Sequence, residues 1–305
     1  MPELPEVQTI VNDLKKKVVG RRIKDIWTDW PKYFRGLSEK NFRKHVIGKK
    51  IISIERRAKN ILFHLSDNHL MLIHQKLSGH LLYGKWQMVP MAKPSRILDK
   101  VGTNGKWMSV VRGPLLEDRN NQYIRLIFFL DNGQMLALSD LRRFAKVLCG
   151  KREEIYNLPD LKKLGPEPLD PKFTFKRFEE LFKKKKGRIK QVLMDPNFIS
   201  GIGNIYADEI LWTAKIHPLV RAEELNRTKF KSIYQAMRKI LKKALKSRGS
   251  SIDDYRDALG RRGRYDLVLS AYQREGEPCK RCRTKIKRLK IGGRSAHFCP
   301  RCQKI

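Results

Sequence analysis

Long hydrophobic runs and acidic residues are both scarce in this sequence of 305 residues. The longest apolar stretches are like Leu126-Ile127-Phe128-Phe129-Leu130, far shorter than the roughly 18 residues that a membrane helix requires. The first residues, Met1-Pro2-Glu3-Leu4-Pro5-Glu6, are acidic and interrupted by proline, unlike a signal or transit peptide. We therefore expect a soluble, cytoplasmic protein without membrane contact.

The shortage of acidic residues leaves a large positive charge. The chain has 67 Lys and Arg against 31 Asp and Glu, a formal net charge of +36. Such a charge repels itself unless a polyanion screens it, and nucleic acid offers a dense line of phosphates. Hydrophobic residues make up 41% of the chain, enough for buried cores, and the length suits about two domains. A nucleic-acid-binding protein is favoured over a merely solvated basic surface.

Cysteine is also scarce, but four of the five cysteines lie close to the C-terminus. Their spacing, Cys279-x2-Cys282-x16-Cys299-x2-Cys302, is typical of a site in which four thiolates bind one structural Zn²⁺. Two disulfides are the alternative, although nothing else in the sequence indicates an oxidising compartment. Cys149 follows an apolar segment and is expected to be a small buried hydrophobic residue.

The first half of the chain predicts an antiparallel β domain. Apolar residues from Val7 to Val18 recur at helical spacing, so a helix is expected almost at the N-terminus. Segments rich in β-branched and aromatic residues follow, and Asp131-Asn132-Gly133 predicts a hairpin turn. We expect strands at 22–27, 50–56, 61–65, 70–74, 123–130 and 134–138. Residues 1–150 are thus predicted to form a β-sandwich or barrel with a helix, interrupted at 83–122 by a long insertion loop.

The second half predicts helices and then the zinc module. The segment 151–172 is rich in proline and is expected to be a linker. Helical periodicity covers 175–185, 190–195, 204–214 and 228–246, within a domain at 173–272. Residues 273–305 form the expected zinc module, which has ten Lys or Arg and no acidic residue from Lys280 onward. That charge indicates contact with nucleic acid.

Three groups of residues are candidates for chemistry. If Met1 is removed, Pro2 has a free α-amine with a reference pKa of roughly 7.7–8.0, so part of it is neutral and nucleophilic near neutral pH. Gly201 and Gly203 precede a helix that Asn204 is expected to cap, and free amides there can hold a phosphate. Leu77, Arg142 and Phe144 together are able to fill the gap left by an extruded nucleotide. Routine turns, caps and core packing explain each group equally well when it is considered alone.

Taken together and in order, these motifs resemble the formamidopyrimidine-DNA glycosylase family over nearly the whole chain, apart from the 83–122 insertion. The resemblance is carried by Met1-Pro2-Glu3-Leu4-Pro5-Glu6, Arg57-Ala58-Lys59, Leu77-Ser78-Gly79, Arg142-Arg143-Phe144, Leu164-Gly165-Pro166-Glu167-Pro168-Leu169, Gly201-Ile202-Gly203-Asn204-Ile205-Tyr206-Ala207 and the four-cysteine finger.

The resemblance implies an α+β fold: an N-terminal antiparallel β-sandwich with flanking helices, a helix-two-turn-helix domain and a zinc-finger β-hairpin. It implies a monomeric glycosylase and abasic-site lyase acting on damaged double-stranded DNA. Pro2 would attack C1′ and form an iminium, Glu3 would act as acid and base, and Glu6 would be a second carboxylate. Lys59 and Arg294 would complete the catalytic set as phosphate-binding residues. The remaining matched positions, which would contact DNA, are His74, Leu77, Arg142, Phe144 and Asn204.

The preferred damaged base is expected to be an oxidised purine, 8-oxoguanine or a formamidopyrimidine. Leu4, Arg142 and Phe144 resemble the branch of the family that acts on purines, although Leu77 stands where that branch typically has Met. The segment 248–273 matches the lesion-capping loop in length, but Gly263-Arg264-Tyr265-Asp266-Leu267 departs from its usual residues. The alternatives are an endonuclease VIII-like enzyme for oxidised pyrimidines or abasic sites, a non-catalytic zinc-finger DNA-binding protein, and an RNA-binding or ribosome-associated protein.

Overall fold

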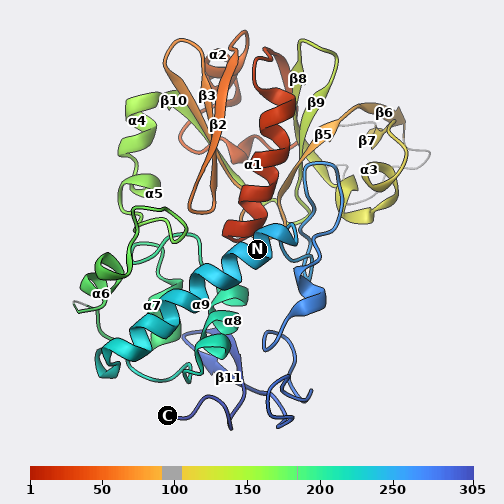
Figure 1. Cartoon of the computed structure of the whole chain (residues 1–305). Coiled ribbons are helices and arrows are strands. Elements are labelled where there is room, and N and C mark those ends of the chain that lie inside the picture. Colours follow the sequence, from red (N-terminus) through yellow and green to blue (C-terminus); the bar gives the residue numbers. More distant parts are fainter. Residues whose placement is uncertain (91–104, 184) are drawn as a thin grey trace. The chain divides into compact units, whose positions relative to one another are not determined.

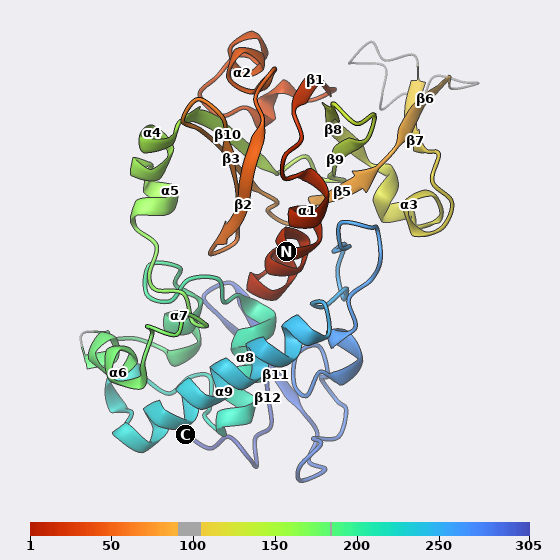
Figure 2. The ribbon, with the colours of Figure 1, turned by 45° about the horizontal axis from the view of Figure 1, so that its top comes forward.

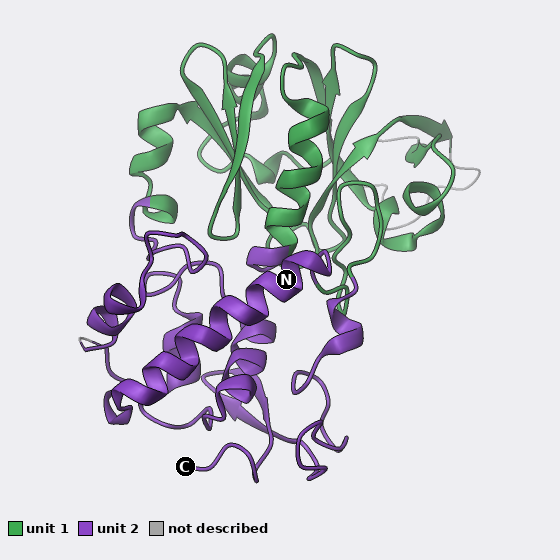
Figure 3. Ribbon diagram, viewed as in Figure 1, with its two compact units in different colours: residues 1–2, 6–161, 250–263 green, residues 3–5, 162–249, 264–305 purple. Residues whose placement is uncertain are grey.

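The computed structural model describes residues 1–90, 105–183 and 185–305. Part of the predicted insertion, 91–104, and Lys184 of the predicted helix 175–185 lie outside the described residues. The chain divides into two compact units, coloured separately in Figure 3. Unit 1 contains Met1–Pro2, Glu6–Leu161 and Ser250–Gly263, and unit 2 contains Glu3–Pro5, Lys162–Gly249 and Arg264–Ile305. The expected domain 173–272 is therefore divided, because 250–263 pack in unit 1.

Unit 1 contains two four-stranded antiparallel sheets, with strand orders β1-β8-β9-β5 and β10-β4-β3-β2. This arrangement, visible in Figure 1 and turned in Figure 2, confirms the predicted β-sandwich with flanking helices. The strands are β1 Ile23–Thr28, β2 Ile51–Arg57, β3 Asn60–Leu65, β4 His69–His74, β5 His80–Gly84, β8 Ile124–Leu130, β9 Met135–Ser139 and β10 Lys146–Lys151. The helices are α1 Leu4–Val18, η1 Pro31–Tyr33, α2 Glu39–Val46, α4 Arg152–Asn157 and α5 Pro159–Lys162.

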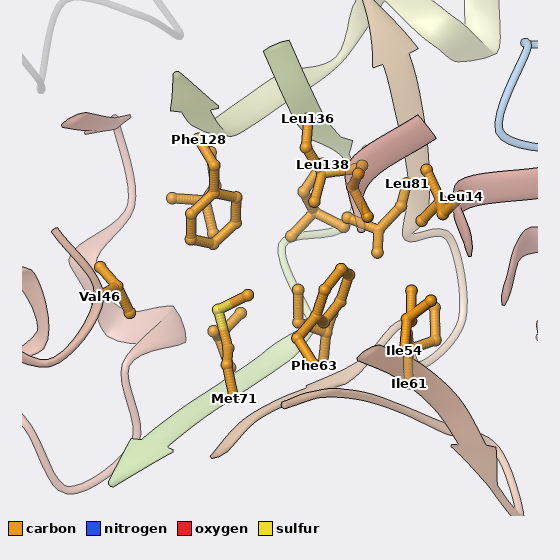
Figure 4. Packing of buried hydrophobic residues seen from close by; sticks show 14 of the residues in the cluster. Leu14, Val46, Ile54, Ile61, Phe63, Met71, Leu81, Phe128, Leu136 and Leu138 are labelled. Atoms are coloured by element: carbon orange, nitrogen blue, oxygen red, sulfur yellow. The ribbon is translucent and has the colours of Figure 1, made fainter. Parts of the chain in front are cut away.

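The core of unit 1 lies between the sheets. Figure 4 shows Phe63 and Met71 from one sheet facing Phe128, Leu136 and Leu138 from the other. Helix α1 adds an apolar stripe to the same cluster, and its lysines at positions 15–17 lie in the last turn, where positive charge complements the helix dipole. Strands such as β3 and β8 are rich in buried aromatic and β-branched residues, which is the signal by which the sequence predicted them.

The described part of the predicted insertion contains regular elements that its lack of periodicity did not indicate. It contains a hairpin of β6 Trp86–Pro90 with β7 Gly105–Ser109, then α3 Pro114–Glu117 and η3 Arg119–Gln122. Trp86, Leu115 and Trp107 pack with Ile127 and Ala137 in a second, smaller hydrophobic cluster. The expected linker 151–172 likewise includes the short helices α4 and α5, because Ile155 and Leu161 are buried.

Unit 2 consists of helices and one hairpin. Its helices are α6 Phe175–Lys183, α7 Ile189–Met194, α8 Asn204–Ala214, η4 Ala222–Glu224, α9 Arg227–Lys246 and η5 Tyr265–Val268, and its hairpin pairs β11 Lys287–Ile291 with β12 Arg294–Phe298. The side chain of Asn226 caps α9 by accepting a hydrogen bond from Lys229 N. Among the described residues, no helix is both long and apolar enough to cross a membrane.

Candidate functional site

The N-terminus of unit 1 brings Pro2 and Glu6 close to residues from much later in the chain. Pro2 is buried just before α1, and Glu6 in its first turn is 1% exposed. The Glu6 Oε1 atom accepts a hydrogen bond of 2.8 Å from Ser250 N. The α-amine of Met1, the residue before Pro2, forms an ion pair of 3.1 Å with Asp253. The segment that begins at Ser250 therefore lies against the start of α1.

Lys59 and His74 lie on neighbouring strand ends in unit 1. Lys59 lies in the β2–β3 turn, where Ala58 adopts a positive φ of 55°, and the next residue, Asn60, pairs with His74 across β3 and β4. Burial lowers the pKa of His74 to about 3, and the charges of Lys76 and Lys59 lower it further. His74 is consequently neutral at physiological pH, and its Nδ1 accepts a hydrogen bond of 3.0 Å from Lys76 N. Because the imidazole is neutral and carries no competing negative charge, Lys59 and Lys76 remain able to donate hydrogen bonds to a phosphate.

The loops that carry Leu77 and Phe144 are joined through one hydroxyl group. Ser78 Oγ donates to Asp140 Oδ1 at 2.6 Å and accepts from Arg142 N at 3.0 Å. Asp140 is fully buried, and its Oδ2 also accepts from Tyr33 Oη and Ala145 N. The structure therefore brings the loop of Leu77 next to the loop of Arg142 and Phe144. Phe144 is 51% exposed, so it is not the core residue that its apolar character alone favoured.

The residue between Arg142 and Phe144 has a different role. Arg143 adopts a left-handed φ of 56°, which turns its side chain away from the exposed Phe144. Its guanidinium lies 4.8 Å from the Trp30 ring centroid and 3.5 Å from Asp29. Arg143 is thus a structural anchor for the loop that displays Arg142 and Phe144 to solvent.

In unit 2, Glu3 occupies the start of α8. Its Oε2 accepts a hydrogen bond of 2.6 Å from Gly203 N, and its Oε1 accepts one of 2.9 Å from Ile205 N. The prediction that Asn204 caps this helix is wrong: Gly203 is the cap residue, and Asn204 is the first helical residue. Gly203 N and Ile205 N both donate to the Glu3 carboxylate, so these two amides at the positive end of the helix are not free to bind a phosphate. Asn204 Oδ1 is buried and accepts no hydrogen bond from the described residues.

A buried ionic network lies close to Glu3. Lys190 on α7 is 1% exposed and forms an ion pair of 2.6 Å with Asp208 on α8. Burial lowers the pKa of Lys190, and the charges of Asp208 and Glu3 partly offset that change. Lys190 also donates to Ser295 O, and Asp208 accepts from His297 N at 2.9 Å. The zinc-module hairpin is thereby attached to both helices.

Arg294 is presented at the tip of that hairpin. It is exposed and begins β12, directly before Ser295, whose carbonyl binds Lys190. At Gly292, which has a positive φ of 54°, an added Cβ would lie only 2.4 Å from Gln191 Nε2. The hairpin turn thus packs closely against α7, which fixes where Arg294 leaves the surface of unit 2.

The cysteines of the predicted zinc site come together as expected. The Sγ atoms of Cys279, Cys282, Cys299 and Cys302 lie within 4.8 Å of one another, and the described cysteines form no disulfide. Tetrahedral zinc with Zn–S bonds of about 2.3 Å separates its sulfurs by about 3.8 Å, so the donor set fits one ion. With four free thiols gathered around one point, the structure favours the zinc site over the alternative of two disulfides.

Several residues of these clusters were not predicted from the sequence. Ser78, Asp140, Lys190, Asp208 and His297 all organise candidate residues through buried contacts. Ser78 belongs to the Leu77-Ser78-Gly79 motif, although no role was predicted for it, and Asp140 lies two residues before Arg142. Lys190 gave no signal, because one lysine does not stand out among 67 Lys and Arg.

Comparison with known proteins covers the whole chain. Three family models match: "Formamidopyrimidine-DNA glycosylase N-terminal domain" at residues 1–147, "Formamidopyrimidine-DNA glycosylase H2TH domain" at 164–256 and "Zinc finger found in FPG and IleRS" at 276–305. The formamidopyrimidine-DNA glycosylase of Pelotomaculum thermopropionicum is 33% identical over all of both chains.

Solved structures of a Lactococcus lactis relative agree. One, a mutant in complex with DNA containing Fapy-dG, has a TM-score of 0.82 at 30% identity and covers 100% of both chains. Another, in complex with DNA containing an abasic site, has a TM-score of 0.82 at 30% identity and covers 99% of this chain and 100% of the other.

These matches and the cysteine geometry establish that the finger binds one structural zinc ion. They also confirm the fold, in which a β-sandwich unit is combined with a helix-two-turn-helix domain and a zinc-finger hairpin. With family models matching most of the chain and relatives aligned from end to end, this protein belongs to the formamidopyrimidine-DNA glycosylase family of DNA-repair enzymes.

Proposed function

We propose that this enzyme removes oxidised purines from duplex DNA with Pro2 as its nucleophile and then cleaves the resulting abasic strand. The observation that carries the proposal is the placement of Glu3. Its carboxylate is 2% exposed, held by two backbone amides and adjacent in sequence to Pro2. A buried, oriented carboxylate next to an α-amine is the pair that acid-base and nucleophilic chemistry at one carbon requires.

The steps follow from these two groups. After removal of Met1, the neutral Pro2 nitrogen attacks C1′ of the damaged nucleotide, and the bond to the base breaks. Glu3 takes up the N–H proton that Pro2 loses and delivers it to the deoxyribose ring oxygen as the C1′–O bond breaks, which opens the sugar and leaves an iminium on Pro2. A base then removes a C2′ proton, and the electron pair of that C–H bond moves to the iminium nitrogen. Return of this pair breaks the C3′–O bond and expels the 3′ phosphate, and loss of the C4′ proton in a second elimination expels the 5′ phosphate. Water finally hydrolyses the iminium and frees Pro2.

The remaining candidates are proposed to bind DNA. Exposed Arg294 and the Lys59 cluster carry positive charge suited to backbone phosphates. Asn204 Oδ1 has no hydrogen-bond partner among the described residues, and the side-chain amide of Asn204 is able to contact the DNA backbone. Phe144, Arg142 and Leu77 are proposed to fill the space that the flipped nucleotide leaves. Glu6 is proposed as a second carboxylate of the reaction, positioned by Ser250.

We further propose that the enzyme acts as a monomer in the cytoplasm. Every residue assigned here comes from one chain, and four thiols committed to zinc suit a reducing compartment. Light scattering of the purified protein with and without duplex DNA measures the oligomeric state.

Borohydride trapping tests the chemistry. Reduction during turnover on an 8-oxoguanine duplex should give a protein–DNA adduct, and peptide mapping should place the link on Pro2. A form that retains Met1 should give no adduct while binding DNA normally. An adduct on Lys59 would overturn the assignment of Pro2, and no adduct from any lesion or abasic duplex would favour a non-catalytic DNA-binding protein.

Parallel excision assays test the substrate class. We expect 8-oxoguanine and formamidopyrimidine duplexes to be processed faster than duplexes with thymine glycol. Faster removal of thymine glycol would instead assign the enzyme to oxidised pyrimidines.

A further inference from the structure

One segment of unit 1, residues 250–263, contacts both the N-terminal residues and the end of the predicted insertion. Its first residue, Ser250, donates to Glu6, and Asp253 binds the Met1 amine. Tyr255 and Ala258 are buried in the main hydrophobic cluster. The segment is therefore part of the surroundings of Pro2 and Glu6 within unit 1. The contacts that hold its other end, residues 256–263, consequently affect the environment in which the reaction takes place.

The first contact at residues 256–263 is a partly buried ion pair. Arg256 binds Asp118, between α3 and η3, through Nε to Oδ2 at 2.6 Å and Nη2 to Oδ1 at 3.2 Å. The arginine side chain is 5% exposed. Burial alone would raise the pKa of Asp118, but hydrogen bonding and the charge of Arg256 hold that pKa below its ordinary value. Both partners are thus charged, and the fork-to-carboxylate geometry fixes direction as well as distance.

The second contact is an amide with three partners. Asn121 is fully buried, and its Nδ2 donates to Pro114 O at 2.7 Å and to Gly260 O at 2.9 Å. Its Oδ1 lies 3.0 Å from His80 Nε2. Gly260 has a positive φ of 78°, and a Cβ there would lie only 2.6 Å from Asn121 Nδ2. The insertion and the segment are fitted closely, so a side chain at position 260 would collide with Asn121.

Further hydrogen bonds stiffen the segment between these contacts. Tyr83 N donates to Ala258 O at 2.7 Å, so residues 256, 258 and 260 are all held by β5 or by the end of the insertion. Asp257 Oδ1 accepts hydrogen bonds from Leu259 N at 2.9 Å and from Arg261 N at 3.0 Å, which closes the tip of the segment, residues 257–261. The tip cannot shift without breaking buried hydrogen bonds.

We propose that Asp118 and Asn121 are positioning residues for base excision, holding residues 250–263 in one conformation beside the N-terminus so that a flipped base meets a preformed surface. This inference rests on the proposed function, because it assumes attack by Pro2 at C1′. The damaged base is one bond from C1′ and must lie near whatever surrounds Pro2. An abasic sugar has no base to position, so the insertion matters for the first step and not for strand cleavage.

The experiment compares two substrates in single-turnover assays of the full-length protein, with an 8-oxoguanine duplex and a preformed abasic duplex. Asp118→Ala and Asn121→Ala should slow base excision by about tenfold or more and leave abasic cleavage within about twofold of the wild type. Arg256→Ala should match Asp118→Ala, and the double variant should be no slower than either, because both remove one contact. Asp131→Asn, an exposed carboxylate in the β8–β9 turn, is the matched control and should change neither rate.

Hydrogen exchange of the free proteins measures the attachment directly. The amides of residues 256–263 should exchange faster in Asp118→Ala than in the wild type or in Asp131→Asn, while the amides of β3 and β4 stay protected. Equal slowing on both substrates, or unchanged exchange at 256–263, would overturn the positioning role. A wild-type protein that cleaves neither duplex would refute the proposed function instead, and exchange at 256–263 would then decide the attachment alone.

Discussion

Glu3 accepts a hydrogen bond with each carboxylate oxygen, from Gly203 N on one and from Ile205 N on the other. An amide in its place would turn an NH₂ group toward one of these donors. We expect Glu3→Gln to lose base excision by at least about a hundredfold and to cost about 1–3 kcal/mol of stability through the unmet donor. Single-turnover excision and urea unfolding measure the two effects.

Glu153→Gln removes an exposed carboxylate from α4 and serves as the control. It should match the wild type in both assays. Full excision activity in Glu3→Gln would remove Glu3 from the mechanism.

One buried and one partly buried histidine, His80 and His74, make stability depend on pH. Burial lowers the pKa of His74 to about 3 and that of His80 to about 4, from an ordinary value near 6.5. Below pH 6.5 the unfolded chain takes up protons that the folded imidazoles refuse, so stability falls as pH drops from about 6.5 toward 4.

The urea midpoint, followed from pH 7 to pH 4.5, should decline over that range, and His80→Gln should decline less steeply. An unchanged slope in His80→Gln would show that His80 does not contribute to the acid sensitivity.

At the level of elements, the loops that carry Leu77 and Phe144 are joined and should act together when a paired lesion is excised. Phe144→Ala removes an exposed ring, and Ser78→Ala removes the hydroxyl that joins the loops. Each should slow excision of a paired lesion more than cleavage of a preformed abasic site, where less pairing must be broken. Equal losses on both substrates would indicate a folding defect.

The zinc-finger hairpin should depend on its metal and also support its neighbours. Cys299→Ser should abolish stoichiometric zinc and weaken DNA binding by at least tenfold, because Arg294 loses its fixed position. Since Ser295 and His297 bind Lys190 and Asp208, the variant should also expose that ion pair and lower the melting temperature. Metal analysis and DNA titration check this, and full affinity without zinc would contradict it.

Elements with strong periodicity were predictable from the sequence, and those made by distant contacts were not. Strands β8 and β9 and helix α9 lie within a residue or two of their expected positions, because their apolar patterns match their period. Helix α2 was missed because only Phe42 and Val46 of its residues are buried. The cap of α8 was misassigned because its acceptor, Glu3, is about 200 residues away in sequence.

The candidate site follows the same division. The cysteine spacing was sufficient to predict the zinc site, since the two cysteines of each Cys-x2-Cys pair are close together in the sequence. The Ser78–Asp140 link and the Asp118–Arg256 pair join residues 62 and 138 positions apart, and no local pattern encodes such pairings.

At the scale of the molecule, each compact unit is assembled from separate stretches of chain. Unit 1 needs Ser250–Gly263 in addition to Glu6–Leu161, because Tyr255 and Ala258 complete its core. Unit 2 likewise takes Glu3–Pro5 from the very beginning. Neither unit is a continuous length of sequence.

This interleaving bears on how the protein is made. On the ribosome, the sheets of unit 1 emerge well before residues 250–263, so the unit remains incomplete until most of the chain has been synthesised. A stalled product ending near residue 161 should retain an exposed gap where Tyr255 belongs, and we expect it to bind chaperones or aggregate. Adding a synthetic peptide of residues 250–263 to that fragment should raise its solubility and melting temperature, whereas a peptide with Tyr255→Ala should not.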